Sequence, residues 1–204
     1  IATLLRQRGY LVLHASCVTN GEHSIAFVGE SGWGKTTLAL YLMKHGFKLV
    51  SDDILVVDLD QQNVGVFYGP SAMKVRSDTG EYLLNKFNKL PRVHSSLSKR
   101  YYSEPRPQIY NDPIKLDKIY FLDQFNKDKN QIKNLSYSDA LLNLVRHTRS
   151  VRWLANKEFL ERHFHQSIKL LKSIPVSLLN RKNSLSSLNE LHNLIQEDLF
   201  NIKN

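Results

Sequence analysis

Short apolar runs alternate with amphipathic stretches along this chain, and the two patterns predict strands and helices in turn. Glycine, proline and asparagine separate the runs, as is typical of turns. The strands that we expect cover residues 10–18, 24–28, 47–53, 54–58, 64–68, 73–76, 114–122 and 174–179. The helices that we expect cover residues 1–8, 37–43, 79–89, 136–149, 157–173 and 185–199. This alternation indicates an α/β fold.

The segments between these elements have less regular patterns. Asn20-Gly21 predicts a tight hairpin between the first two strands. Residues 91–113 hold four prolines and are expected to be irregular, whereas the polar residues 123–134 are expected to form a surface connection. Because Pro175 cannot donate to a ladder, residues 174–179 are expected to form an edge strand.

Residues 24–37 combine a buried apolar strand, a glycine loop and the first turn of a helix. The spacing Gly29, four residues, Gly34-Lys35-Thr36 satisfies the phosphate-binding pattern G-x-x-x-x-G-K-[ST]. Glycines let the backbone N–H groups converge on phosphate oxygens, at the positive end of the helix dipole. The residues that we expect to bind nucleotide are Gly29, Glu30, Ser31, Gly32, Trp33, Gly34, Lys35, Thr36 and Thr37. Lys35 would reach the terminal phosphates, and the Thr36 hydroxyl would bind Mg²⁺.

Two adjacent carboxylates, Asp52 and Asp53, follow the strand expected at residues 47–53. In nucleotide-binding α/β sheets the ligand lies at the carboxyl ends of the strands. One carboxylate can therefore bind the Mg²⁺ ion of Thr36, and the other can accept a proton from an attacking hydroxyl, as in a kinase. The alternative is a simple turn, which Asp-Asp pairs often begin.

Other polar residues admit both a functional and a structural interpretation. His14 lies in the strand before the hairpin, near the glycine loop, although a single histidine in a strand is usually a packed residue. Lys74 and Arg76 lie on one side of a strand and either contact phosphate or face solvent. Arg146, His147 and Arg149 end a helix, where cations are favourable in any protein.

The chain has 204 residues and a net charge of +9, which could indicate an acidic partner. The charge is distributed, with +4 in residues 1–103 and +5 in residues 104–204. One stretch is locally basic, and its residues are Lys86, Lys89, Arg92, Lys99, Arg100 and Arg106. This stretch is either a solvated loop or a surface that binds an acidic peptide or nucleotide phosphates.

Length and 42% hydrophobic content fit one domain over residues 1–204. The chain begins at Ile1 instead of Met, so we expect that some N-terminal residues are missing. No apolar run has the roughly 20 residues needed to cross a bilayer, and we expect a cytoplasmic protein without membrane contact. The single cysteine, Cys17, excludes an internal disulfide and is interpreted as a small buried hydrophobe.

His14, the 29–37 loop and Ser51-Asp52-Asp53, in this order, resemble the catalytic domain of HPr kinase/phosphorylase. The resemblance implies a P-loop nucleotide-binding fold of the HPr kinase and phosphoenolpyruvate carboxykinase type, a mixed sheet with flanking helices. Gly69-Pro70, residues 115–122, residues 144–149 and Ile174-Pro175-Val176 extend it to the compact HPr-kinase-like proteins of lasso peptide biosynthesis, which phosphorylate a serine at the precursor's C-terminus.

This resemblance implies roles for the residues that match. The cofactors would be ATP and Mg²⁺, with Lys35 at the phosphates and Thr36 and Asp52 at the metal. Asp53 would be the base that deprotonates the acceptor serine of a peptide or protein, and His14 its partner. Self-association is expected by analogy with HPr kinases. A Glu-Val-Arg-Gly-Leu-Gly segment is missing after the aspartates, which argues against HPr as substrate and against phosphorylase activity.

Three other functions fit the same residues. A kinase of the same fold could act on a small hydroxyl compound such as free serine. A nucleotide-binding sensor without turnover is a second alternative, although it would not require Lys35, Thr36, Asp52 and Asp53 together. Nucleic-acid binding is the least favoured, because the positive charge is distributed along the chain.

Overall fold

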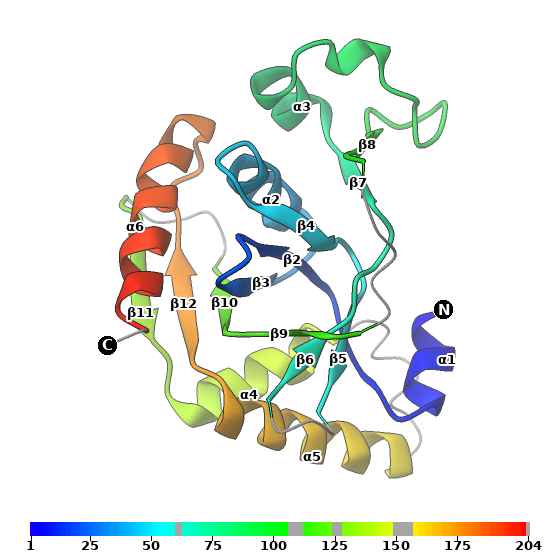
Figure 1. The fold of residues 1–204 in the computed structure, drawn as a ribbon, viewed down its shortest axis with the longest axis vertical. Coiled ribbons are helices and arrows are strands. Elements are labelled where there is room, and N and C mark those ends of the chain that lie inside the picture. Colours follow the sequence, from blue (N-terminus) through cyan, green and yellow to red (C-terminus); the bar gives the residue numbers. More distant parts are fainter. Residues whose placement is uncertain (60–62, 106–111, 124–127, 149–156, 203–204) are drawn as a thin grey trace.

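The computed structural model describes residues 1–59, 63–105, 112–123, 128–148 and 157–202. Within them, the main sheet has six strands (Figure 1). In spatial order these are β11 (Gln131–Asn134), β12 (Val176–Asn180), β10 (Lys118–Leu122), β3 (Ser24–Val28), β2 (Ala15–Thr19) and β4 (Lys48–Ser51). A second sheet contains β1 (Leu11–Leu13), β5 (Leu55–Asp58), β6 (Gly65–Val66) and β9 (Ile114–Lys115). A separate ribbon pairs β7 (Ala72–Val75) with β8 (Arg100–Ser103).

Helices cover both faces of the main sheet. The described residues form α1 (Ala2–Gln7), α2 (Lys35–Met43), α3 (Ser77–Leu83), α4 (Tyr137–Arg146), α5 (Lys157–Ser173) and α6 (Leu188–Phe200), with 3₁₀ turns η1 (Phe87–Lys89) and η3 (Leu185–Ser187). Of these, α1 contacts β1 of the second sheet, and α3 contacts α2 and η1. In β3, Ile25 and Phe27 pack with α2 and α6, whereas Ala26 and Val28 pack with α4, α5 and the second sheet. Because both faces are covered, all five side chains of β3 are buried.

The sheet is mixed, as predicted, and its strand directions bring several chain segments to one edge. β3 runs parallel to β10, and β10 runs parallel to β12. β2 is antiparallel to both β3 and β4, so β4 runs in the same direction as β3. The carboxyl ends of β3, β4, β10 and β12 and the start of β2 therefore meet at the same edge of the sheet, as ligand sites in α/β sheets require.

Two predicted strands are each divided between the two sheets. Residues 10–18 form β1, which pairs with β5, and β2, which pairs with β3 and β4, so His14 lies at the bend between the sheets. Residues 114–122 likewise form β9 and β10. At this second bend, Asp117 accepts a hydrogen bond from the backbone of Ser24 at 2.9 Å. The apolar run over residues 10–18 did not reveal the first bend, because β1 and β2 are both buried.

Four further predictions of local structure were wrong. Residues 91–113 include β8, and residues 123–134 include β11, whose polar sequence suits a sheet edge. Because β11 covers β12, the strand predicted at the edge lies inside the sheet; Pro175 precedes β12 and removes no donor from its ladder. The helix expected at residues 79–89 ends at Leu83 and is followed by η1.

Several other local predictions are confirmed, although α4 ends at Arg146 and the strand expected at residues 64–68 is limited to Gly65–Val66. Asn20-Gly21 joins β2 to β3, with Gly21 at φ 93°. Ser136 caps α4 by accepting the backbone N–H of Asp139 at 3.1 Å. Cys17 is fully buried, and burial raises the pKa of its thiol, as expected for a structural cysteine. None of the helices in the described residues is long and apolar enough to span a membrane.

Candidate active site

The glycine loop, residues 29–36, joins β3 to α2 at the convergent edge of the main sheet. Gly32 and Gly34 have φ values of 89° and 76°, in the left-handed region that favours glycine. Gly34 is also the N-cap of α2. The loop therefore curls back over the start of the helix, so that the first N–H groups of α2 point into the loop.

Lys35 occupies the interior of the glycine loop. Its ammonium donates to the backbone oxygens of Gly29 and Glu30 at 2.8 and 2.9 Å, and the residue is only 6% exposed. A lysine held in this way has a fixed position at the base of the loop, where an anion bound by the loop would meet it.

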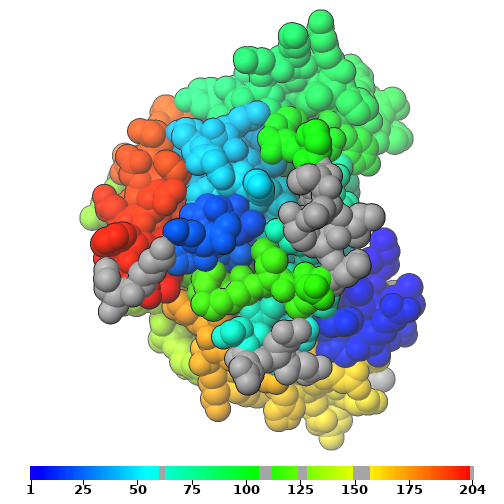
Figure 2. All heavy atoms as spheres, in the orientation of Figure 1, coloured from blue at the N-terminus to red at the C-terminus, as the bar shows by residue number. Residues whose placement is uncertain are grey.

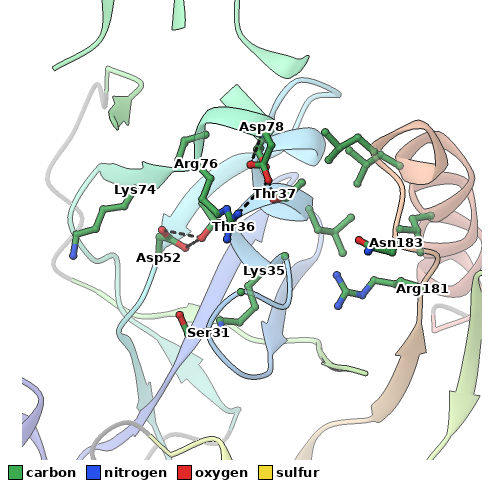
Figure 3. Close-up of a pocket in the computed structure, with 18 of the residues that line it drawn as sticks. Ser31, Lys35, Thr36, Thr37, Asp52, Lys74, Arg76, Asp78, Arg181 and Asn183 are labelled. Atoms are coloured by element: carbon green, nitrogen blue, oxygen red, sulfur yellow. Dashed lines mark hydrogen bonds and ion pairs between the residues drawn. The ribbon is translucent and has the colours of Figure 1, made fainter. Parts of the chain in front are cut away.

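Asp52 follows β4 and contacts two hydroxyl groups from neighbouring elements. Ser16 of β2 donates to its Oδ1 at 2.5 Å. Thr36 of α2 donates to the same oxygen at 3.0 Å (Figure 3). Burial raises the pKa of Asp52, although these two hydrogen bonds act in the opposite direction. Two hydroxyl groups thus hold the carboxylate, and no ion pair between Asp52 and a cation is present in the part of the chain that the structure describes.

Asp53 has a different environment from its neighbour. Its φ of 73° lies in the left-handed region, which is uncommon for a residue with a side chain and is frequent at functional sites. This turn directs the carboxylate toward the bend at His14, whose Nε2 lies 3.3 Å from Oδ1. Lys74 of β7 lies 3.8 Å from Oδ2. The sequence placed His14 near the loop, and the structure brings it to Asp53.

A cleft of about 600 Å³ lies above these residues. One wall is the glycine loop, and a second comes from β7 and the start of β8 with Lys74, Arg76 and Lys99. The third wall follows β12 and includes the polar residues 181–184 and then Leu185, Leu188 and Leu191. Among the described residues, six cationic side chains and three carboxylates line the cleft, so it suits an anionic ligand.

Not every residue predicted to bind nucleotide lines this cleft. Ser31, Gly32, Gly34, Lys35, Thr36 and Thr37 do so, whereas Gly29, Glu30 and Trp33 do not. Thr37 also contacts the hydroxyl of Thr79 in α3 at 2.8 Å. Trp33 instead packs against the ring of His147, with 5.5 Å between ring centroids.

The end of α4 supports the loop from outside the cleft. His147 is buried, which lowers its pKa, and its backbone oxygen accepts the N–H of His14 at 3.4 Å. Its position between Trp33 and His14 favours a supporting role over a chemical one. Arg146 is exposed at the last turn of the helix. Arg149 lies outside the described residues.

Two arginines approach the cleft from opposite walls. The guanidinium of Arg76 points toward Thr36 and lies 3.5 Å from the carboxylate of Asp78 (Figure 3). Arg181, directly after β12, is buried and donates to the backbone oxygen of Asp123 at 3.0 Å. Burial lowers the pKa of Arg181 to about 10, so it remains a cation at neutral pH.

Sequence reasoning missed Ser16 and Arg181. Ser16 lies within an apolar strand, and no local pattern distinguishes it from a packed serine. Arg181 follows an apolar run in the same way as Asp52 follows β4, and this signal could have identified it. Both become site residues because strands distant in sequence end at the same edge.

Comparisons with known proteins give limited information. No protein-family model matches the chain, and no curated protein matches it. Among solved structures, the chain is similar to the Hpr(Ser) kinase/phosphatase from Coxiella burnetii, with a TM-score of 0.48 and 11% identity over 94% of this chain and 92% of that chain. Likeness at this level carries no conclusion about activity, which depends on the geometry of the cleft.

Proposed function

We propose that the protein is a Mg·ATP-dependent kinase that transfers the γ-phosphoryl group to a serine hydroxyl of a peptide or protein. One observation carries the proposal: Lys35, Thr36 and the two carboxylates at residues 52–53 come from separate elements and converge on one cleft. These are the groups that phosphoryl transfer needs for phosphate binding, metal binding and proton removal. Among acceptors, the C-terminal serine of a lasso-type precursor peptide follows from the sequence resemblance.

The cleft suggests a direction for the nucleotide. The phosphates would lie along the glycine loop, with Lys35 beneath them and the N–H groups of α2 at their side. Because Asp52 and Asp53 mark the position of the terminal phosphate, the rest of the nucleotide would extend toward the third wall. There Leu185 and Leu188 offer apolar contacts to a base, and residues 181–184 offer polar ones.

Thr36 and Asp52 fit a magnesium ion. Mg²⁺ prefers hard oxygen ligands, and a hydroxyl and a carboxylate oxygen lie 3.0 Å apart here. The charge of Asp52 is disfavoured by burial, as the raised pKa indicates, and a cation would reverse this effect. When bound, the ion would neutralise charge on the phosphates.

Asp53 is the proposed general base. As the serine oxygen forms its bond to the γ-phosphorus, the bond from that phosphorus to the bridging oxygen breaks, ADP leaves, and the serine proton moves to the Asp53 carboxylate. His14 and Lys74 hold that carboxylate from two sides. Arg76 and Arg181 are placed to stabilise negative charge on the phosphoryl oxygens.

Phosphate transfer from γ-labelled ATP to serine peptides, to free serine and to HPr tests the proposal. Lys35→Ala is expected to reduce transfer by about a thousandfold and to weaken nucleotide binding. Lys48→Ala, which removes an exposed lysine of β4, serves as a matched control and should retain activity. Transfer to free serine alone would redirect the proposal to a small-molecule kinase. Tight ATP binding with no transfer to any acceptor would support the sensor instead.

A further inference from the structure

One face of the ribbon formed by β7 and β8 is polar and faces the cleft. Met73 and Val75 turn inward and are buried, so Lys74 between them turns outward, with a side chain that is 48% exposed. Tyr101 stands directly opposite Lys74 in the ladder and is therefore on the same face. Tyr101 is also exposed.

The same face continues with two more cations. Val75 pairs with Arg100, so the next position on each strand places Arg76 opposite Lys99. Lys74, Arg76 and Lys99 all line the cleft. Because Lys74 pairs with Tyr101, Lys74 and Lys99 are diagonal neighbours in this ladder. Such neighbours lie about 7–8 Å apart in antiparallel sheets.

These cations are only weakly neutralised by the protein. Lys74 lies 3.8 Å from Asp53, and Arg76 lies 3.5 Å from Asp78, and both cations are exposed. Of the described residues, none offers Lys99 a carboxylate within 4 Å. Long contacts between exposed charges stabilise a protein little and are readily exchanged for better partners.

The position of this face leaves it open to the phosphoryl acceptor. The proposed nucleotide lies between the glycine loop and the wall after β12, whereas Lys74 is on the side of Asp53 that this nucleotide does not cover. Residues 77–98 and the ribbon project from the main body as a lobe (Figure 2). An acceptor chain that brings a hydroxyl to Asp53 therefore passes along the ribbon.

We infer that the ribbon face binds an acceptor peptide that carries aspartate or glutamate close to its serine. Adjacent residues on an extended peptide are about 3.3 Å apart, so carboxylates two residues apart match the spacing of Lys74 and Lys99. Tyr101 adds an aromatic surface between them for the peptide backbone and side chains. The inference rests on the proposed kinase function and specifies its substrate class.

A binding measurement tests the docking independently of the chemistry. Two fluorescently labelled peptides have alanine in place of the C-terminal acceptor serine and carry either aspartates or asparagines at alternate positions before it. The aspartate peptide should bind with about three- to tenfold higher affinity at low salt, and this difference should decrease as salt is raised. Equal affinities for the aspartate and asparagine peptides would overturn the inference. Binding of an RNA oligonucleotide of equal charge as tightly as the aspartate peptide would also overturn it.

Charge-reversal variants locate the effect on the ribbon. Lys99→Glu should remove the preference for the aspartate peptide, whereas Lys133→Glu makes the same change on exposed β11 and should keep it. A thermal unfolding midpoint equal to that of wild type confirms that each variant is folded, and Lys99→Gln provides a milder second variant. Equal loss in Lys99→Glu and Lys133→Glu would overturn the inference.

Phosphate transfer to the matching serine peptides separates the two proposals. Preferential binding of the aspartate peptide without transfer would support the docking surface and contradict the kinase. Equal transfer to the aspartate and asparagine peptides would support the kinase and contradict the docking surface.

Discussion

The floor of the cleft and its ribbon wall are held in different ways. The floor consists of the glycine loop and the end of β4, where hydroxyl groups contact Asp52 at 2.5 and 3.0 Å and the Lys35 ammonium contacts two carbonyls. On the ribbon, the ion pairs of Lys74 and Arg76 are 3.8 and 3.5 Å long, and both cations are exposed.

This difference indicates a division of labour. Short hydrogen bonds to charged groups in partly buried surroundings hold their members in one arrangement, as transition-state stabilisation requires. Exposed ion pairs hold their side chains loosely, and each side chain can exchange its partner for a charge on a bound molecule. Asp53 belongs to both regions, because it contacts His14 on one side and Lys74 on the other.

Asp53→Asn should have the largest effect, since it removes the base that both regions position. We expect transfer to decrease by about a thousandfold, within the usual range for a general base, while nucleotide affinity stays within about twofold. Asparagine tolerates a left-handed backbone, so the φ of 73° is retained. Single-turnover transfer and nucleotide titration measure the two quantities. Asp128→Asn, on an exposed site, is the control, and normal transfer in Asp53→Asn would remove Asp53 from the mechanism.

Acidification should weaken the support of the floor. His163 of α5 is buried, contacts the Thr148 hydroxyl at 2.6 Å, and has a pKa lowered by burial from 6.5 to about 4. The backbone of Thr148 forms an isolated β-bridge with Leu13, the residue before His14. Because the unfolded chain takes up the proton more readily, stability present above pH 6.5 is lost as the pH falls toward 4, by about 3 kcal/mol in total.

Denaturant unfolding at several pH values checks this expectation. His163→Gln cannot titrate, so its free energy of unfolding should depend less on pH between 6.5 and 4 than that of wild type, and the remaining dependence should come from groups such as His147. If the free energies of unfolding of wild type and His163→Gln depend on pH in the same way, His163 is not the group that titrates.

Gly80→Ala should affect the ribbon lobe more than the floor. A Cβ atom at residue 80 would lie 2.1 Å from the ring of Phe87, so α3 and η1 would have to move apart. Overpacking of this kind typically costs about 1–3 kcal/mol. We expect amides of residues 77–103 to exchange faster with deuterium, while nucleotide affinity changes little. Glu81→Ala, on the exposed side of α3, should leave exchange unchanged, and uniform loss of protection over the whole chain would show that the lobe and floor unfold together.

The floor was more predictable from the sequence than the ribbon, for a physical reason. The glycine loop, Lys35 and Thr36 are close in sequence, and their spacing alone implies the local geometry. Asp52 and Asp53 were expected at the end of a strand. The order of strands in the sheet then places Asp52 beside Thr36. The pairing of β7 with β8 joins residues separated by a long insertion, and no local pattern indicates such a partner.

The bend at His14 shows a second limit of sequence patterns. An apolar run fits a straight buried strand as well as two strands in different sheets, because burial on both faces removes the alternation that would mark a change. The sequence therefore predicted that His14 lies near the glycine loop. It did not predict the bend between β1 and β2 that directs His14 toward Asp53.

Ser16→Ala should have the smallest effect and tests whether the floor depends on its short contacts. The variant removes the 2.5 Å hydrogen bond to Asp52 and leaves that of Thr36. Loss of one hydrogen bond to a charged group amounts to about 1.5 kcal/mol, or about tenfold in transfer rate. The same loss should raise the Asp52 pKa further, so transfer should require a higher pH or more Mg²⁺. Ser24→Ala is the control for stability, because Ser24 lies in the same sheet and contacts neither Asp52 nor Asp53. If Ser16→Ala shows a rate, pH profile and Mg²⁺ requirement equal to those of wild type, the arrangement of Asp52 depends on Thr36 and the backbone alone, and the contrast between floor and ribbon is smaller than the distances suggest.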